Sequence, residues 1–209
     1  MNRWNLEFGE EFRAAYGTGV RYREFGPDDR RRLSDTVPEY LLNLWETDGW
    51  AGYRDGLLWT VDPSDFTDVV AAWNLPADLM EHGPLVPVAR TAFGTLYLLK
   101  YYLTAKGDLA QSVLNVDPVR GIYSVVGPWG PRFLTRTIAQ EDYIEVVFDE
   151  PLARRVAVDL GGLEWNEMYA YEPALALGGS GAAETLRQVN IFAHHMFLSQ
   201  AMTLRNQKY

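Results

Sequence analysis

Residues 85–126 read LVPVARTAFGTLYLLKYYLTAKGDLAQSVLNVDPVRGIYSVV, and this stretch decides the fold class. It holds four apolar runs rich in β-branched and aromatic residues, which are favoured in strands. Glycine, aspartate and proline residues lie between the runs and are typical of turns. We therefore predict paired strands at Val86–Phe93, Thr95–Leu103, Leu109–Val116 and Ile122–Val126.

Helical patterns precede this strand-rich stretch. Pro38 suits a first helical position, and Gly49 is expected to end the helix. Between them lies an apolar stripe of Tyr40, Leu41, Leu44 and Trp45. A hairpin with Asp55-Gly56 at its turn follows. A second helix is expected after Asp62, because apolar residues recur there at i, i+3, i+4 and i+7. These residues are Phe66, Val69, Val70 and Trp73.

The last helix is expected to follow the glycine-rich segment 178–181 and to extend to about Leu204. Ser180 is its expected N-cap, since a serine oxygen accepts a hydrogen bond from an unpaired amide. His194 and His195 are expected on its polar face, and residues 164–171 fit either a helix or a loop. Helices and antiparallel strands are segregated along the chain, so the predicted class is α+β. We expect two small α+β domains, residues 1–105 and 106–209, each with an antiparallel sheet and packed helices.

The composition narrows the class of protein. The chain has 209 residues, a formal net charge of −9 and no cysteine, which excludes disulfides, thiolate zinc sites and cysteine nucleophiles. The longest stretch without a formal charge, Gln188–Leu204, contains two histidines and other polar residues and is not expected to span a bilayer. The amino terminus lacks the apolar core of a signal peptide. We expect a cytoplasmic protein that has no contact with a membrane.

The acidic excess is concentrated between Asp35 and Glu81. This window holds ten acidic residues, one basic residue (Arg54) and four of the seven tryptophans. A negative field repels nucleic acid, so no direct contact with nucleic acid is expected. The same field favours a basic protein partner. The alternative is a solvated acidic surface over an aromatic core.

The acidic window also supplies the expected contact residues of a protein interface. Trp50 directly follows Gly49 and is expected to be exposed as an aromatic anchor. The acidic contact candidates are Glu46, Asp48, Asp62, Asp65 and Asp68. If Trp50 instead packs under the hairpin, these acids only keep the protein soluble.

No motif in the sequence indicates catalysis. The segment Gly178–Ala182 has an alanine where a nucleophile elbow needs its second glycine. The three glutamates Glu164, Glu167 and Glu172 leave open a carboxylate-dependent hydrolase as an alternative. The expectation is a protein with no catalytic residue, no metal and no cofactor.

The carboxy-terminal half carries the most specific pattern in the chain. Residues 167–179, EMYAYEPALALGG, resemble the carboxy-terminal domain of type VI secretion immunity proteins of the Tdi kind. Ala170-Tyr171 stands where this family often has Gly-Phe. The amino-terminal half is similar to the GAD-like domain that precedes the carboxy-terminal domain in that family. This similarity rests on Gly49-Trp50, Asp55–Trp59, Asp62–Phe66 and Ala92–Tyr97.

The resemblance implies a bacterial immunity protein that neutralises a co-encoded toxin by stoichiometric binding. In the best-known members that toxin is a DNase. The segment Glu172–Gly179 is expected to be buried framework, with Leu175 and Leu177 in the core of the second domain. A third alternative is a Smi1/Knr4-like scaffold module, because such modules share the tryptophan and glycine pattern around residues 45–59.

Overall fold

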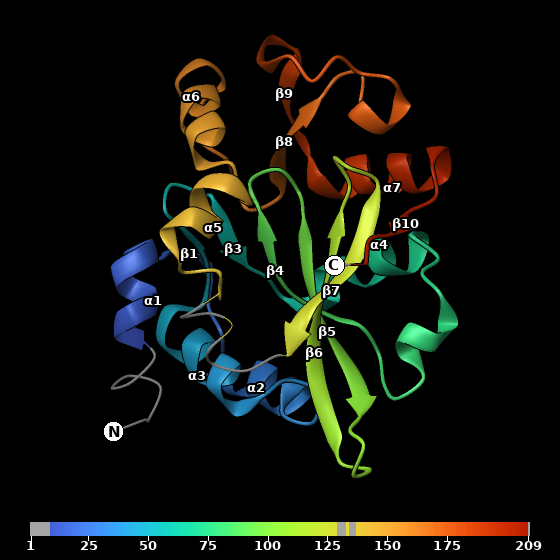
Figure 1. Ribbon diagram of the computed structural model, residues 1–209. Helices are drawn as coiled ribbons and strands as arrows, with labels where there is room; N and C mark the ends of the chain where they lie inside the picture. Colours follow the sequence, from blue (N-terminus) through green and yellow to red (C-terminus); the bar gives the residue numbers. More distant parts are fainter. Residues whose placement is uncertain (1–8, 129–132, 134–136, 209) are drawn as a thin grey trace.

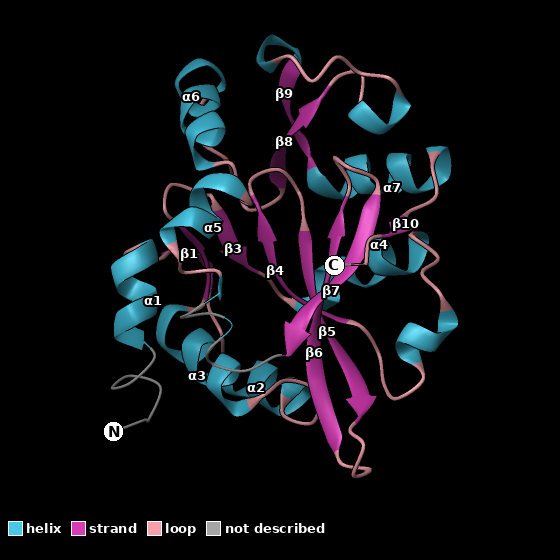
Figure 2. Ribbon diagram, viewed as in Figure 1, coloured by secondary structure: helices cyan, strands magenta, loops and turns pink. Residues whose placement is uncertain are grey.

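The computed structural model describes residues 9–128, 133 and 137–208. An eight-stranded sheet crosses its centre in the order β1-β2-β3-β4-β5-β6-β7-β10 (Figures 1 and 2). Its neighbouring strands are antiparallel except β7 and β10, which are parallel. The strands of this sheet are β1 (Val20–Arg23), β2 (Trp50–Tyr53), β3 (Leu58–Thr60), β4 (Val86–Thr91), β5 (Leu96–Leu103), β6 (Leu109–Asp117), β7 (Ile122–Pro128) and β10 (Arg205–Asn206).

Helices cover this sheet, and a separate hairpin of β8 (Glu167–Tyr171) and β9 (Leu186–Asn190) lies beyond one end of it (Figure 1). The α-helices are α1 (Gly9–Tyr16), α2 (Pro27–Leu33), α3 (Glu39–Asp48), α4 (Thr67–Ala72), α5 (Glu141–Val146), α6 (Glu150–Leu160) and α7 (Ile191–Ala201). The short 3₁₀ helices are η2 (Pro63–Phe66), η3 (Ala77–Met80), η5 (Leu175–Leu177) and η6 (Ala183–Thr185). Together the elements confirm the α+β class.

Both faces of the sheet are buried, and β5 shows this most clearly. Its residues Tyr97, Leu99 and Tyr101 join the hydrophobic cluster that α1, α3, α5 and α6 cover. Leu96 and Leu98, on the opposite face, join the cluster that α4 and α7 cover. Because both faces pack against helices, the strand is apolar at nearly every position instead of alternating with polar residues.

The predicted helix and hairpin at the start of the acidic window are confirmed. Helix α3 ends at Asp48, and Gly49 follows it with a φ of 72°. A Cβ added to Gly49 would lie 2.6 Å from the carbonyl oxygen of Arg23, so both the backbone conformation and the close approach require glycine. Strands β2 and β3 then pair through Gly52–Trp59 and Tyr53–Leu58.

The prediction for the last helix is wrong in its first third. Residues 186–190 form β9, which pairs with β8 along its whole length. Helix α7 begins only at Ile191, because the Asn190 side chain caps it by accepting a hydrogen bond from the Ala193 amide at 3.0 Å. The hydroxyl of Ser180 caps no helix and instead accepts from the Ala182 amide at 3.2 Å.

Helix α6 is not among the helices that the sequence pattern predicts, and the pattern of residues 164–171 fits both a helix and a loop. Residues 167–171 form β8. Helix α6 has Pro151 in its first turn and Gly161 at its end, both of which are helix-boundary signals. Its buried positions include Ala153 and Val156, which are spaced for one face of a helix.

The expected domain boundary near Lys106 falls in the turn between β5 and β6. These two strands pair from Leu96–Val116 to Leu103–Leu109. The central sheet therefore continues across the expected boundary, and both parts of the chain contribute strands to it.

Candidate interaction surfaces

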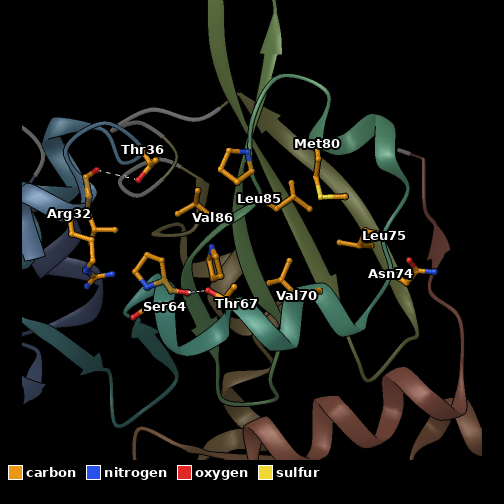
Figure 3. Close-up of a pocket in the computed structure, with 15 residues that line it drawn as sticks. Arg32, Thr36, Ser64, Thr67, Val70, Asn74, Leu75, Met80, Leu85 and Val86 are labelled. Atoms are coloured by element: carbon orange, nitrogen blue, oxygen red, sulfur yellow. Dashed lines mark hydrogen bonds between the residues drawn. The ribbon is translucent and has the colours of Figure 1, made fainter.

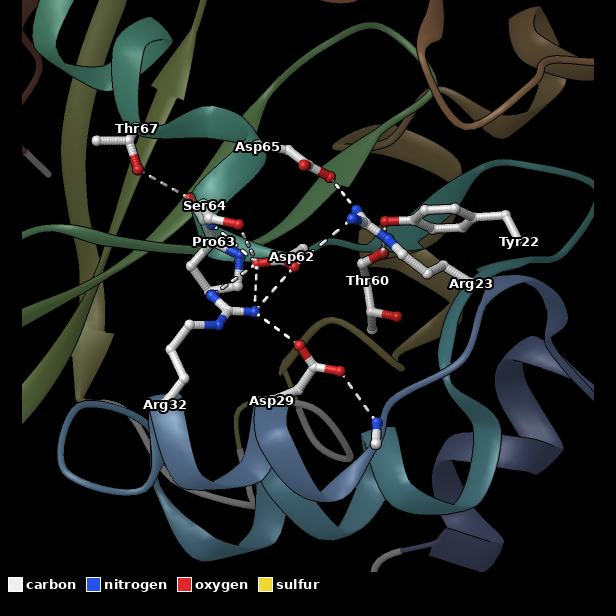
Figure 4. Close-up of polar contacts among 11 residues, drawn as sticks. Tyr22, Arg23, Asp29, Arg32, Thr60, Asp62, Pro63, Ser64, Asp65 and Thr67 are labelled. Carbon is white, nitrogen blue, oxygen red and sulfur yellow. Dashed lines mark hydrogen bonds and ion pairs between the residues drawn. The ribbon is translucent and has the colours of Figure 1, made fainter.

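Asp62 lies at the centre of a cluster of ion pairs (Figure 4). Its carboxylate accepts from Arg32 Nη2 at 3.0 Å and lies 3.7 Å from Arg23 Nη1. It also caps η2 by accepting from the amide of Ser64 at 2.9 Å. Arg23 pairs in addition with Asp65. The Asp62 side chain is 5% exposed, so its negative charge is neutralised by arginines within the protein.

Trp50 is a core residue, and the expectation that it is exposed is wrong. The side chain is 1% exposed. Its ring meets Phe25 edge-on with the ring centroids 5.3 Å apart, and the ring of Trp45 lies 6.1 Å away. The guanidinium of Arg23 lies 4.9 Å from the centre of the Trp50 ring. Trp50 therefore packs against Phe25, Trp45 and Arg23, where its large apolar area is removed from water.

Asp48 and Glu46 are also paired. Asp48, at the end of α3, accepts from Arg13 Nη2 at 2.7 Å and from the hydroxyl of Tyr53 at 2.9 Å, and it is buried. Glu46 lies 3.0 Å from Arg30 Nη1 but remains exposed. The arginines that neutralise the acidic window therefore come from residues 13–32, outside the window itself.

Of the six expected contact residues, only Glu46 and Asp68 are exposed. Asp48, Trp50 and Asp62 are buried, and Asp65 is half-buried against Arg23. Four exposed acids of the window carry no ion pair to a described residue. These are Asp35, Asp55, Asp68 and Asp78, while Glu81 lies 3.8 Å from His82 Nε2.

An apolar groove of about 530 Å³ lies among α2, α4, η3 and β4, and we call it the α4 groove (Figure 3). Thr67, Val70, Ala71 and Asn74 line it from one face of α4 and the turn that follows. Leu75, Leu85 and Val86 are the buried residues of its lining, and Met80, which also lines it, is 43% exposed. The spacing that predicted this helix grouped Val70 with Phe66, Val69 and Trp73, but Val70 is half-buried and lines the groove.

The segment Glu172–Gly179, which we call the Tdi-like motif, lies mostly at the surface, and the expectation of a buried framework is wrong for most of it. Leu177 is 42% exposed and Leu175 is half-buried, while Ala174 is the buried residue of the run. Leu177 and His194 line a second groove of about 450 Å³ between the motif and α7. The motif adopts η5 and a turn, which leave its leucines at the surface.

His195 is buried, and the expectation that it lies on a polar helix face is wrong. Its Nδ1 accepts from the indole nitrogen of Trp73 at 3.0 Å. Its Nε2 lies 2.9 Å from the carbonyl oxygen of Gly94, to which it donates. Burial lowers the pKa of His195 to about 3, so the ring is neutral at pH 7. The ring joins α7 to α4 and to the turn before β5.

Two arginines make similar connections between the amino-terminal and carboxy-terminal halves. Arg90 of β4 donates to the carbonyl oxygens of Glu164 and Trp165, each at 2.9 Å, and burial lowers its pKa to about 9. Arg54, in the β2–β3 turn, forms a two-pronged pair with Glu150 of α6 at 2.5 and 2.7 Å. These contacts join the halves of the chain outside the sheet as well.

Two of the three glutamates of the hydrolase alternative, Glu167 and Glu172, are not brought together, while the Glu167 carboxylate accepts a hydrogen bond from the Glu164 amide at 2.9 Å. Glu167 begins β8 and Glu172 follows its last residue, which separates them by about 16 Å along an extended strand. Paired catalytic carboxylates of glycosidases lie about 5–9.5 Å apart. Among the described residues there is no group of three histidine, aspartate or glutamate side chains placed to hold a metal ion. None of the described helices has the length and apolar character needed to cross a membrane.

Comparison with known proteins gives likenesses to solved structures and two family matches. No curated protein matches the sequence. The fold is similar to that in "Crystal structure of Atu4351 from Agrobacterium tumefaciens", with a TM-score of 0.71, 17% sequence identity, and coverage of 94% of this chain and 90% of that one. At this identity the likeness shows a shared fold.

The family matches cover separate stretches in sequence order. Residues 7–109 match the GAD-like domain, and residues 132–202 match the carboxy-terminal domain of T6SS immunity protein Tdi1. The second match includes the segment 167–179 on which the resemblance was based. On these two matches, the chain belongs to the type VI secretion immunity proteins of the Tdi kind, with a GAD-like domain followed by the Tdi1 carboxy-terminal domain.

Proposed function

We propose that this chain binds a cognate type VI secretion toxin in a one-to-one complex and neutralises it, and that the toxin is a basic DNase. The single observation that carries this proposal is the match of residues 132–202 to the Tdi1 carboxy-terminal domain. The chain acts by occupying a surface of the toxin and takes no part in chemistry itself. Its place of action is the cytoplasm of the producing cell.

The charge of the chain supports a basic partner. The formal net charge is −9, and several acids of the window 35–81 remain exposed without an ion pair to a described residue. A nuclease needs a basic surface to hold phosphates. An acidic inhibitor is attracted to such a surface, which raises the rate of association.

Co-expression tests the proposal. The cognate toxin is produced with or without this chain in a bacterial host, and growth and chromosomal DNA integrity are followed. We expect the toxin alone to degrade DNA and arrest growth, and the chain to restore both. Matched strains carry an unrelated protein of the same charge in place of this chain.

A second experiment tests complex formation with purified proteins. The chain is mixed with a nuclease-inactive variant of the toxin and passed over a size-exclusion column. Co-elution in equal molar amounts supports stoichiometric inhibition. Rescue of growth without any complex, or loss of rescue in a Glu167→Ala variant that still folds, would point instead to the hydrolase alternative.

A further inference from the structure

The α4 groove combines an apolar floor with an accessible opening (Figure 3). Leu75, Leu85 and Val86 are buried beneath it, whereas Val70 is half-buried and Met80 is exposed at its edge. Ala71 adds a small exposed side chain to the α4 wall. The α4 groove can therefore bury apolar side chains of a binding partner.

The elements that form the groove also carry the unpaired acids. Asp35 is next to the lining residue Thr36, and Asp68 is next to Thr67 on α4. Asp78 lies in η3, which also supplies Met80. All three acids are exposed and have no ion pair to a described residue.

The charged side chain that lines the groove does not offset these acids. Arg32 lines the groove, but its guanidinium pairs with Asp29 and Asp62, each at 3.0 Å (Figure 4). Its positive charge is therefore already matched inside the protein. Asp35, Asp68 and Asp78, which we call the acidic rim, are thus adjacent in sequence to residues that line the α4 groove or lie on the same short helix as one of them.

We propose that the α4 groove docks a basic, amphipathic segment of the toxin, with apolar side chains in the groove and lysine or arginine side chains on Asp35, Asp68 and Asp78. The proposal rests on the proposed function and adds the docking site and the chemistry of the docked segment. An amphipathic helix laid into an apolar groove is a recurring mode of recognition. The acidic rim selects a basic segment over an acidic or neutral one.

The experiment uses the full chain and the nuclease-inactive cognate toxin, with binding followed by surface plasmon resonance. Met80→Asp and Ala71→Trp change the groove at two exposed positions, one by charge and one by filling it. Val158→Asp in α6 is the matched control, because Val158 is 85% exposed and does not line the groove. Thermal unfolding verifies that each variant folds.

A second pair of variants tests the rim. Asp68→Lys with Asp78→Lys reverses two rim charges, and Asp142→Lys with Asp159→Lys reverses two exposed charges on α5 and α6. We expect the rim pair to slow association about tenfold at low salt and to flatten its salt dependence. The control pair changes the net charge equally and should slow association much less.

For the groove variants we expect Met80→Asp and Ala71→Trp each to raise the Kd at least about tenfold through faster dissociation. Val158→Asp should bind like the wild type. Wild-type affinity in both groove variants, with the wild-type chain still binding the toxin, would overturn the groove proposal and leave the proposed function standing. Absence of binding by the wild-type chain itself would overturn both.

Discussion

The His195 ring makes two hydrogen bonds, to Trp73 and to Gly94, that require the ring to be neutral. Trp73 donates to its Nδ1, so the ring proton is on Nε2 and points to the Gly94 carbonyl oxygen. A protonated ring would place a second hydrogen against the Trp73 N–H. Burial without a neighbouring acid makes the charged form unfavourable and lowers the pKa to about 3.

The first prediction concerns the pH dependence of stability. An unfolded histidine titrates near pH 6.5, and folded His195 titrates near 3. The unfolded state therefore binds more protons between these values, and the free energy of unfolding falls as the pH falls through this range. At pH 5 the loss from this residue is about 2 kcal/mol. Urea unfolding at pH 7 and pH 5 measures it.

The control for this prediction is His195→Gln, because an amide can donate to Gly94 and accept from Trp73 without titrating. Other groups titrate in both proteins, so the difference between the two losses isolates His195. We expect the wild type to lose more free energy of unfolding on acidification than the variant. Equal losses would show that the buried ring does not control the acid sensitivity.

The second prediction compares two aspartates of the acidic window. Asp62 caps η2 and pairs with Arg32 and Arg23 while buried. Asp62→Ala should lower the free energy of unfolding by about 2–3 kcal/mol, because it removes a cap and leaves two arginines without their acid. The exposed residue Asp68 is the control, and Asp68→Ala should cost less than about 1 kcal/mol. Equal losses in chemical denaturation would contradict this account.

At the scale of single residues, the sequence identified the acidic window but not the partners of its acids. Asp48, Asp62 and Asp65 are neutralised by arginines from α1, β1 and α2 that precede the window in the chain. These pairs form only after the fold brings the elements together, so spacing along the chain contains no sign of them. Trp50 was misplaced for the same reason, because the residues that cover it come from other elements.

At the scale of elements, the strands were predictable where their neighbours are adjacent in sequence. Strands β4 to β7 pair in chain order and are separated by turn residues, so local pattern was sufficient. Strand β9 was misread as helix because Leu186 and Val189 fit a helical spacing with the residues of α7. Strand β9 pairs with β8, which lies before the intervening residues 172–185. This pairing makes residues 186–190 a strand instead of a helix.

The third prediction concerns the exposed leucine of the Tdi-like motif. Leu177→Asp should lower the free energy of unfolding by less than about 1 kcal/mol, because its side chain is 42% exposed and a new carboxylate there stays in water. Leu198→Asp in α7 is the contrast. Leu198 is 1% exposed, and a buried unpaired carboxylate costs several kcal/mol.

Circular dichroism during thermal unfolding distinguishes these two variants. A Leu177→Asp protein that fails to fold would contradict the surface placement of the motif and restore the expectation of a buried framework. If the Leu177→Asp protein folds, residues that line the groove between the motif and α7 can be substituted without unfolding the protein.

At the scale of the whole molecule, the central sheet begins in the first matched stretch and continues through β6, β7 and β10, which lie almost wholly outside both matches. Strand β5 lies in the first matched stretch, and most of β6 lies beyond the end of that match. His195, Arg90 and Arg54 add hydrogen bonds and ion pairs between the halves. Mutual burial of this kind makes independent folding of either half unfavourable.

The fourth prediction is that residues 1–105 do not fold alone. The fragment would expose the β5 edge and one side of each hydrophobic cluster. We expect it to lack dispersed amide signals in an NMR spectrum and to fold when residues 106–209 are co-expressed. A fragment that unfolds cooperatively by itself would support two independent domains that meet near Lys106.

The central claim is stoichiometric neutralisation of a DNase, and titration of toxin activity tests it most directly. A fixed, near-saturating concentration of the purified toxin cleaves plasmid DNA while increasing amounts of this chain are added. The account predicts that cleavage falls linearly and ends at one molar equivalent. Undiminished cleavage at a large molar excess of the folded chain, or full inhibition at a small fraction of an equivalent, would contradict it.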